Sequence, residues 1–230
     1  MPDYSNPANI TLIFGKGSSG KSSFAFSYLL NSGRPPRGAG PAAAVFIFDD
    51  RGQAAQRLGL QSVGTKDDCE AALATGWVCF NPHIRYPGAL LPDAFRWFCD
   101  WSFQASKRGP GRKILFVDEL WQWSRSRTSV PPELENVIRT GRTEGLEFVT
   151  ATHSPREYHE LVRSQATEFV AFNTVEPAQL ESIEPYWPGV NAAAKLTPGQ
   201  FLAYNRNTGG TEAGMMEPGW PPGKFYRVTE

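Results

Sequence analysis

The chain has 230 residues, of which 40% are hydrophobic, 13% aromatic and 20% charged, and its 23 basic residues balance its 23 acidic ones. This length and composition are those of a globular domain with a sizeable core, which excludes disordered, collagen-like and disulfide-scaffold proteins. The net charge of zero argues against a protein that coats nucleic acid by bulk charge, although it leaves room for a local basic patch.

Membrane and disulfide signals are missing from the sequence. No apolar run approaches the roughly 18 residues of a spanning helix, and the polar N-terminal stretch does not resemble a signal peptide. The three cysteines show no metal-ligand spacing, and their odd number leaves one without a mate. We therefore expect a soluble protein with no transmembrane segment, in a reduced, intracellular setting.

Short apolar runs alternate with longer, partly amphipathic segments, the pattern of parallel strands joined by crossover helices. The expected strands are residues 10–14, 43–48, 77–80, 114–117, 146–151 and 169–172. The expected helices are residues 21–31, 92–107, 132–142, 155–164 and 177–186. After residue 186 Pro and Gly recur and interrupt the regular pattern. In this part we expect a strand at 200–204, a turn-rich stretch at 205–210 and a last strand at 225–228.

The first expected strand leads directly into a match to the phosphate-binding motif G-x-x-x-x-G-K-[ST]. The motif comprises Gly15, Lys16, Gly17, Ser18, Ser19, Gly20, Lys21 and Ser22, and we add Ser23 to the expected binding residues. Its glycines let successive backbone N–H groups face a phosphate, and the following helix N-terminus adds its positive dipole. Lys21 would reach the β- and γ-phosphates of a nucleoside triphosphate, while the Ser22 hydroxyl would ligate Mg²⁺. A mere Gly-rich turn is the alternative, but the position between a strand and a helix favours the motif.

Two carboxylates, Asp118 and Glu119, end the expected strand at 114–117. Asp118 would hold Mg²⁺ through water, and Glu119 would polarise the attacking water as a general base. Adjacent acids also occur as solubilising caps of strands, but their pairing with an intact phosphate-binding loop favours catalysis. The pair favours hydrolysis over small-molecule kinase chemistry, because a kinase places its second substrate rather than water at the γ-phosphate.

The next expected strand ends at Thr152 and His153, at the carboxyl edge where ligands bind in open α/β sheets. Either side chain could sense the γ-phosphate or orient water. The alternative is that a Thr and a His before Pro155 simply cap a helix.

Taken together, these residues resemble the FtsK/HerA superfamily of DNA-pumping ATPases, and within it the small genome-packaging ATPases of membrane-containing icosahedral viruses. The resemblance rests on the phosphate-binding loop with its additional Lys16, the stretch 48–52, the strand 114–119 and the segment 138–155. His153 departs from the family, which has Gln there. The match covers about residues 8–205 of a single domain spanning 1–230, with 206–230 as a C-terminal extension. It implies an α/β fold: a RecA-like additional-strand P-loop NTPase core, mainly parallel in its central sheet and flanked by helices, with a short C-terminal β extension.

The resemblance also implies ATP with Mg²⁺ and a homo-oligomeric ring, commonly hexameric, in which an arginine of one subunit completes the neighbour's site. Arg142 and Arg139 match the family's arginine-containing segment, and Arg163 is a third candidate. Such an arginine would neutralise charge developing on the γ-phosphate. The alternative is a solvated helix C-terminus, where arginines favour the helix dipole.

The charges are unevenly distributed along the chain, since residues 106–142 carry 8 basic and 4 acidic side chains. Within this basic segment, residues 121–129 interleave Trp121, Trp123, Arg125 and Arg127 with hydroxyl residues directly after the catalytic acids. Such a loop can follow phosphate backbones without reading sequence. The alternative is that the two tryptophans anchor the core or a subunit interface. A second basic cluster at residues 107–113 is expected to be a solvated connection.

The leading hypothesis is an ATP-driven motor that translocates double-stranded DNA into a viral capsid. It would act in the host-cell cytoplasm or at the virion's packaging vertex, with a capsid-vertex or membrane packaging protein as a further partner. One alternative is a filamentous-phage assembly ATPase of the zonular occludens toxin type, which would normally carry a membrane-spanning segment. The other is a P-loop small-molecule kinase, for which an arginine-rich substrate lid near the end of the chain is lacking.

Overall fold

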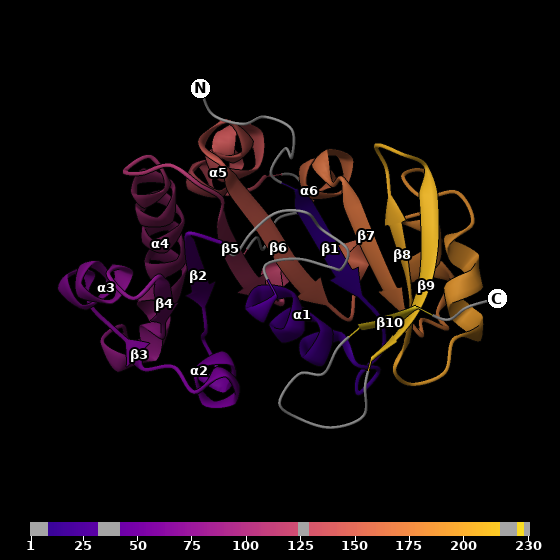
Figure 1. The fold of residues 1–230 in the computed structure, drawn as a ribbon, viewed down its shortest axis with the longest axis horizontal. Helices are drawn as coiled ribbons and strands as arrows, with labels where there is room; N and C mark the ends of the chain where they lie inside the picture. The colour runs from indigo at the N-terminus through magenta and orange to yellow at the C-terminus, as the bar shows by residue number, and fades with distance from the viewer. Residues whose placement is uncertain (1–8, 32–41, 124–128, 217–224, 228–230) are drawn as a thin grey trace.

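The structure is a computed structural model that describes residues 9–31, 42–123, 129–216 and 225–227. These residues form one sheet of ten strands in the order β10-β9-β8-β7-β1-β6-β5-β2-β4-β3, covered by helices on both faces (Figure 1). Every pairing from β7 to β3 is parallel, and β8, β9 and β10 extend the sheet as antiparallel strands. The expected α/β class with a mainly parallel sheet and a C-terminal β extension is therefore confirmed.

The parallel strands are short and almost wholly buried. They are β1 (Ile10–Phe14), β2 (Ala44–Phe48), β3 (Ser62–Val63), β4 (Trp77–Phe80), β5 (Lys113–Asp118), β6 (Leu146–Thr152) and β7 (Glu168–Phe172). The antiparallel strands are β8 (Gln200–Asn205), β9 (Gly210–Met216) and β10 (Phe225–Arg227). Because β1 lies between β6 and β7, and β5 lies next to β6, the carboxyl ends of these strands meet at one edge of the sheet.

Two apolar clusters hold the helices against the sheet. On one face α1 (Lys21–Leu30) and α2 (Gln53–Leu58) pack against alternate strand residues such as Ile13 and Phe116. The opposite face carries α3 (Lys66–Leu73), α4 (Leu91–Ser106), α5 (Pro132–Thr140), α6 (Glu160–Gln165), α7 (Pro177–Glu181) and the 3₁₀ segment η6 (Val190–Lys195). Within the described residues, no helix is long and apolar enough to cross a membrane.

Several expected elements need correction. The helix expected at 155–164 is two pieces, η5 (Pro155–Glu157) and α6, because Tyr158 and His159 are extended and the His159 ring caps α6 by accepting from the Leu161 N–H at 3.1 Å. The helix expected at 177–186 ends at Glu181. The helix expected at 132–142 ends at Thr140 and tightens into η4 (Gly141–Glu144). The sequence reading missed α2, α3, β3 and β9, all of which are short or weakly periodic.

Candidate active site

The phosphate-binding loop follows β1 in a conformation that glycine makes possible. Gly15 and Gly20 have positive φ angles of 151° and 114°. A Cβ at Gly15 would lie 2.6 Å from the Phe172 Cβ, and one at Gly20 would lie 2.9 Å from the Phe172 ring. Gly17 is different, because a Cβ there would meet nothing within 4 Å. The first and third glycines therefore permit the close approach of the loop to the end of β7, while Gly17 keeps the pocket side of the loop open.

The backbone donors of this loop suit an anionic ligand. Gly15 and Lys16 donate to Thr152 and Asn173, but no backbone N–H of residues 17–23 donates to another described residue. These groups surround the N-terminus of α1, where the helix dipole favours negative charge. The Ser19 hydroxyl is buried without a hydrogen-bond partner among the described residues. Donors without partners at a helix N-terminus fit the phosphates that the motif predicts.

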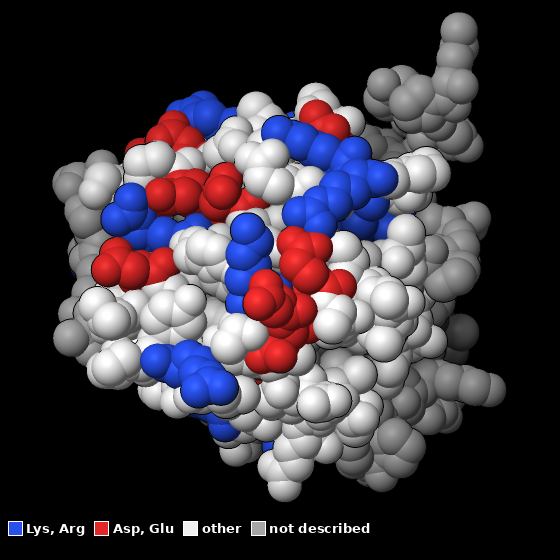
Figure 2. All heavy atoms as spheres, turned by 90° about the vertical axis from the view of Figure 1, so that its left-hand side faces the viewer, with Lys and Arg blue, Asp and Glu red and all other residues white. Residues whose placement is uncertain are grey.

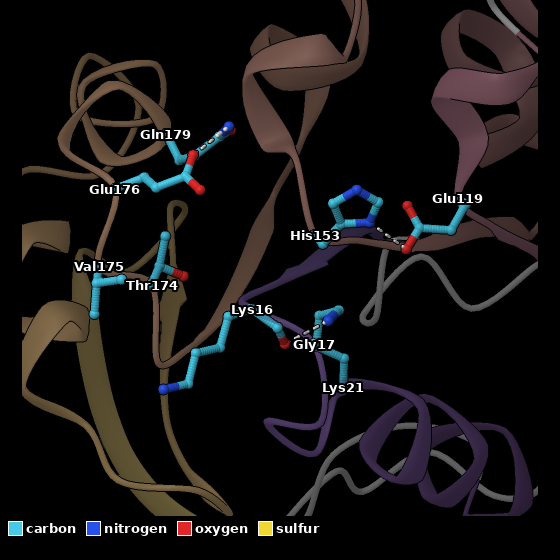
Figure 3. A pocket seen from close by; sticks show the side chains of 9 residues that line it. All are labelled: Lys16, Gly17, Lys21, Glu119, His153, Thr174, Val175, Glu176 and Gln179. Carbon is cyan, nitrogen blue, oxygen red and sulfur yellow. Dashed lines mark hydrogen bonds and ion pairs between the residues drawn. The ribbon is translucent and has the colours of Figure 1, made fainter.

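Lys21 is the buried cation of the site. Its Nζ donates to the Lys16 carbonyl at 2.8 Å, which folds the side chain back over the loop (Figure 3). Burial lowers the pKa of Lys21, while the nearby charges of Glu119 and Asp118 raise it in part. A phosphate group in the pocket would give this cation the anionic partner that its burial calls for.

The two carboxylates lie where β5 ends. Burial, and secondarily the charge of Glu119, raises the pKa of Asp118 to about 6. The Asp118 Oδ1 accepts from the Glu119 N–H at 3.1 Å. A metal ion would counter both effects, and Asp118 with the Ser22 hydroxyl supplies the hard oxygen ligands that Mg²⁺ prefers. Among the described residues no cluster of three or more acidic, His or Cys side chains could hold a metal ion.

Glu119 adopts a left-handed backbone conformation, with φ 46° and ψ 51°, that is unusual for a residue with a side chain. Three donors converge on its carboxylate. Thr152 Oγ1 lies 3.0 Å and Trp121 Nε1 2.9 Å from Oε2, while His153 Nδ1 lies 3.0 Å from Oε1. The structure thus brings Glu119, Thr152 and His153 together at one edge of the sheet. It adds Trp121, which the sequence reading assigned to a DNA loop or a core.

These groups open onto a pocket of about 340 Å³ above the loop (Figure 3). Its near wall consists of Lys16, Gly17, Lys21, Glu119 and His153, and its far wall of Thr174, Val175, Glu176 and Gln179. Sequence reasoning missed the far wall. A signal existed, because these residues directly follow β7, whose carboxyl end lies beside that of β1.

A second group of charged residues adjoins Asp118 from β2. Asp49, Asp50 and Arg51 line a smaller cavity with Asp118, and the charge of Arg51 acts to lower the pKa of Asp118. Burial raises the pKa of Asp50 itself. Asp49 has a structural role, because its Oδ2 accepts from the Ala55 N–H in α2 at 2.8 Å.

The arginine candidates lie away from this chain's own pocket. Arg139 lies in the last turn of α5 and Arg142 lies in η4, which leads into the amino end of β6, whereas Thr152 ends the same strand at the pocket edge. Arg142 is exposed. Arg139 is also exposed but donates to Glu135 at 2.7 Å. Neither arginine is among the described residues that line the pocket of its own chain.

The expected nucleic-acid loop is only partly described, because Arg125 and Arg127 lie outside the described residues. Trp123 is half-buried and packs against Phe48 and Phe95, with ring centroids 5.0 and 5.9 Å away. This packing fits the alternative in which the tryptophan anchors the core. In the second basic cluster Arg108 pairs with Glu70. Basic and acidic side chains are interleaved on the face turned toward the viewer in Figure 2, so this face has no uniform charge.

The sheet order and the phosphate-binding loop after β1 together define the fold of a P-loop NTPase. Among solved structures, the chain is similar to the genome packaging NTPase B204 of Sulfolobus turreted icosahedral virus 2 in complex with ATP-gammaS, with a TM-score of 0.70 and 20% identity over 90% of this chain and 97% of that one. The DNA-packaging ATPase B204 of Sulfolobus turreted icosahedral virus gives 0.63 and 21%, with coverages of 90% and 97%. ATPases 2 and 3 of EssC from Geobacillus thermodenitrificans give 0.55 and 11%, with coverages of 95% and 39%. No protein-family model and no curated protein matches the sequence.

Proposed function

We propose that this protein is an ATP-hydrolysing motor that translocates double-stranded DNA and packages a viral genome. The observation that carries the hydrolase part is the position of Glu119, whose carboxylate lines the same pocket as Lys21 and the open side of the phosphate-binding loop. The neighbours named above support the packaging part, because the B204 proteins are a genome packaging NTPase and a DNA-packaging ATPase.

Each site residue has a distinct task in hydrolysis. The water oxygen attacks the γ-phosphorus while the bond to the β–γ bridging oxygen breaks, and the water proton passes to the Glu119 carboxylate. Lys21 and the free N–H groups of the loop stabilise the charge on the phosphate oxygens. Thr152 and His153 hold Glu119 and the water in line. Mg²⁺, held by Ser22 and Asp118, would supply further positive charge to the phosphates.

A second copy of the chain would complete the site in a homo-oligomeric ring. Arg142 is the better candidate for the neighbour's pocket, because it is exposed and remote from its own, whereas Arg139 is engaged with Glu135. The proposed partners are double-stranded DNA and a capsid-vertex or membrane packaging protein. The proposed location is the host cytoplasm or the packaging vertex of the virion.

The test is ATP hydrolysis with and without double-stranded DNA, together with the oligomeric state. The wild-type rate should rise when DNA is added, and Lys21→Ala or Glu119→Gln should lower it roughly 10²- to 10⁴-fold. Lys195→Ala and Glu181→Gln, which change exposed side chains of the same types, should leave it unchanged. Hydrolysis that ignores DNA would contradict the motor, and phosphate transfer to a small molecule instead of water would favour the kinase alternative.

A further inference from the structure

Trp121 has no assigned role in hydrolysis, yet its indole contacts two residues of the site. Its Nε1 donates to Glu119 Oε2 at 2.9 Å, and its ring meets the His153 ring edge-to-face with centroids 6.2 Å apart. It lies in the single-turn segment η3 (Leu120–Gln122) directly after β5. Leu120 before it is fully buried and Trp123 after it packs on Phe48, so the backbone that carries Trp121 is fixed on both sides.

The three donors occupy the Glu119 carboxylate unequally. An ionised carboxylate offers about four lone-pair positions, two on each oxygen. Trp121 and Thr152 take both positions on Oε2, while His153 takes one on Oε1. Only Oε1 therefore keeps a position for the proton of an attacking water.

The backbone of Glu119 makes this clamp necessary. The left-handed conformation of a non-glycine residue is strained and persists only where surrounding contacts hold it. The Glu119 N–H donates to the Ala151 carbonyl at 2.9 Å, which fixes the main chain. The side chain can still rotate about its own bonds, and the indole N–H and the Thr152 hydroxyl oppose that rotation.

We propose that Trp121 is a positioning residue, which clamps Glu119 Oε2 and so makes Oε1 the oxygen that accepts the water proton. The role rests on the proposed hydrolysis of ATP but does not depend on DNA. Its loss should slow the chemical step and leave nucleotide binding as it is, because the indole hydrogen-bonds no residue of the phosphate-binding loop.

The test is DNA-independent hydrolysis by Trp121→Phe, which keeps an aromatic ring and removes the N–H. The kcat should fall about tenfold with KM unchanged, the size expected for one hydrogen bond to a charged group. The matched control is Trp123→Phe two residues away, because the Trp123 indole N–H is buried without a partner among the described residues. Its kcat should stay within about twofold of the wild type.

A double-mutant cycle separates positioning from general damage to the fold. In a Glu119→Gln background, Trp121→Phe should cause no further loss, because the clamp has no catalytic carboxylate to hold. Equal losses in both backgrounds, a rise in KM with kcat unchanged, or an unchanged kcat in the single variant would each overturn the role while leaving the proposed function intact. A wild-type protein that does not hydrolyse ATP would overturn both.

Discussion

Replacing Asp118 by Asn should stabilise the protein in the absence of nucleotide and metal. Burial and the adjacent Glu119 raise the pKa of Asp118 from 3.8 to about 6, so the fold penalises the charged form. Each unit of difference between folded and unfolded states corresponds to about 1.36 kcal/mol, which gives about 3 kcal/mol at most. Because Asp118 is partly exposed, water screens some of this, and we expect a gain of about 1 to 3 kcal/mol. Asn can still accept the Glu119 N–H, so the packing need not change.

The sign of the pH dependence follows from the raised pKa. Below about pH 4 the carboxyl is protonated in both states and carries no penalty. As the pH rises through the window from about 4 to 6, the unfolded chain releases its proton first, and wild-type stability falls until the penalty is complete above about pH 6. The advantage of Asp118→Asn should therefore appear across this window and stay constant above it.

The assay is urea unfolding of both proteins in chelator at about pH 4.5 and about pH 8. Asp100→Asn is the control, because Asp100 is exposed on α4 and, among the described residues, its side chain accepts a hydrogen bond only from Gln104. A variant no more stable than the wild type at the higher pH would refute the reasoning. So would one that is more stable by the same amount at both pH values.

Three further outcomes are expected. Gly15→Ala should lower the free energy of unfolding by about 2 to 4 kcal/mol, because the new Cβ would clash with Phe172 and the residue has a positive φ. Gly17→Ala should lower the free energy of unfolding by less than about 1 kcal/mol. Urea unfolding distinguishes the two variants, and equal effects would contradict the geometry. The three cysteines are buried and their pKa values are raised by burial, so a thiol reagent should label them only after urea is added, and fast labelling of the folded protein would contradict their burial. Arg142→Ala subunits mixed with Glu119→Gln subunits should regain part of the wild-type ATPase rate, and a mixture no more active than its components would count against Arg142 as the trans residue.

The sequence predicted six of the seven parallel strands because each contains a continuous apolar run, such as residues 44–48 and 114–117, that a sheet covered on both faces can bury, whereas β3 has only two residues. It missed α2 and α3 for a physical reason. These helices have six and eight residues, and the first turn of α2 is held by a side chain outside the helix, the Asp49 carboxylate that accepts from the Ala55 N–H. Short helices owe most of their stability to such packing rather than to local pattern.

The same distinction applies to the site. Gly15 through Ser22, Asp118 and Glu119 could be predicted because each group occupies contiguous residues whose chemistry depends on spacing along the chain. Trp121 and Gln179 could not. The direction of an indole in a single 3₁₀ turn, and the hydrogen bond from Gln179 of α7 to Ser154 after β6, follow from tertiary contacts that no periodicity records.

The left-handed backbone at Glu119 has a consequence for how this chain can change over generations. Glycine adopts that conformation without steric strain, so Glu119→Gly would relieve about 1 kcal/mol of strain while removing the carboxylate that we propose as the general base. Replacing the charged Asp118 would also favour the fold. Selection for stability alone would therefore erode both acids, and their retention in descendants of this sequence would be a direct record of selection for turnover.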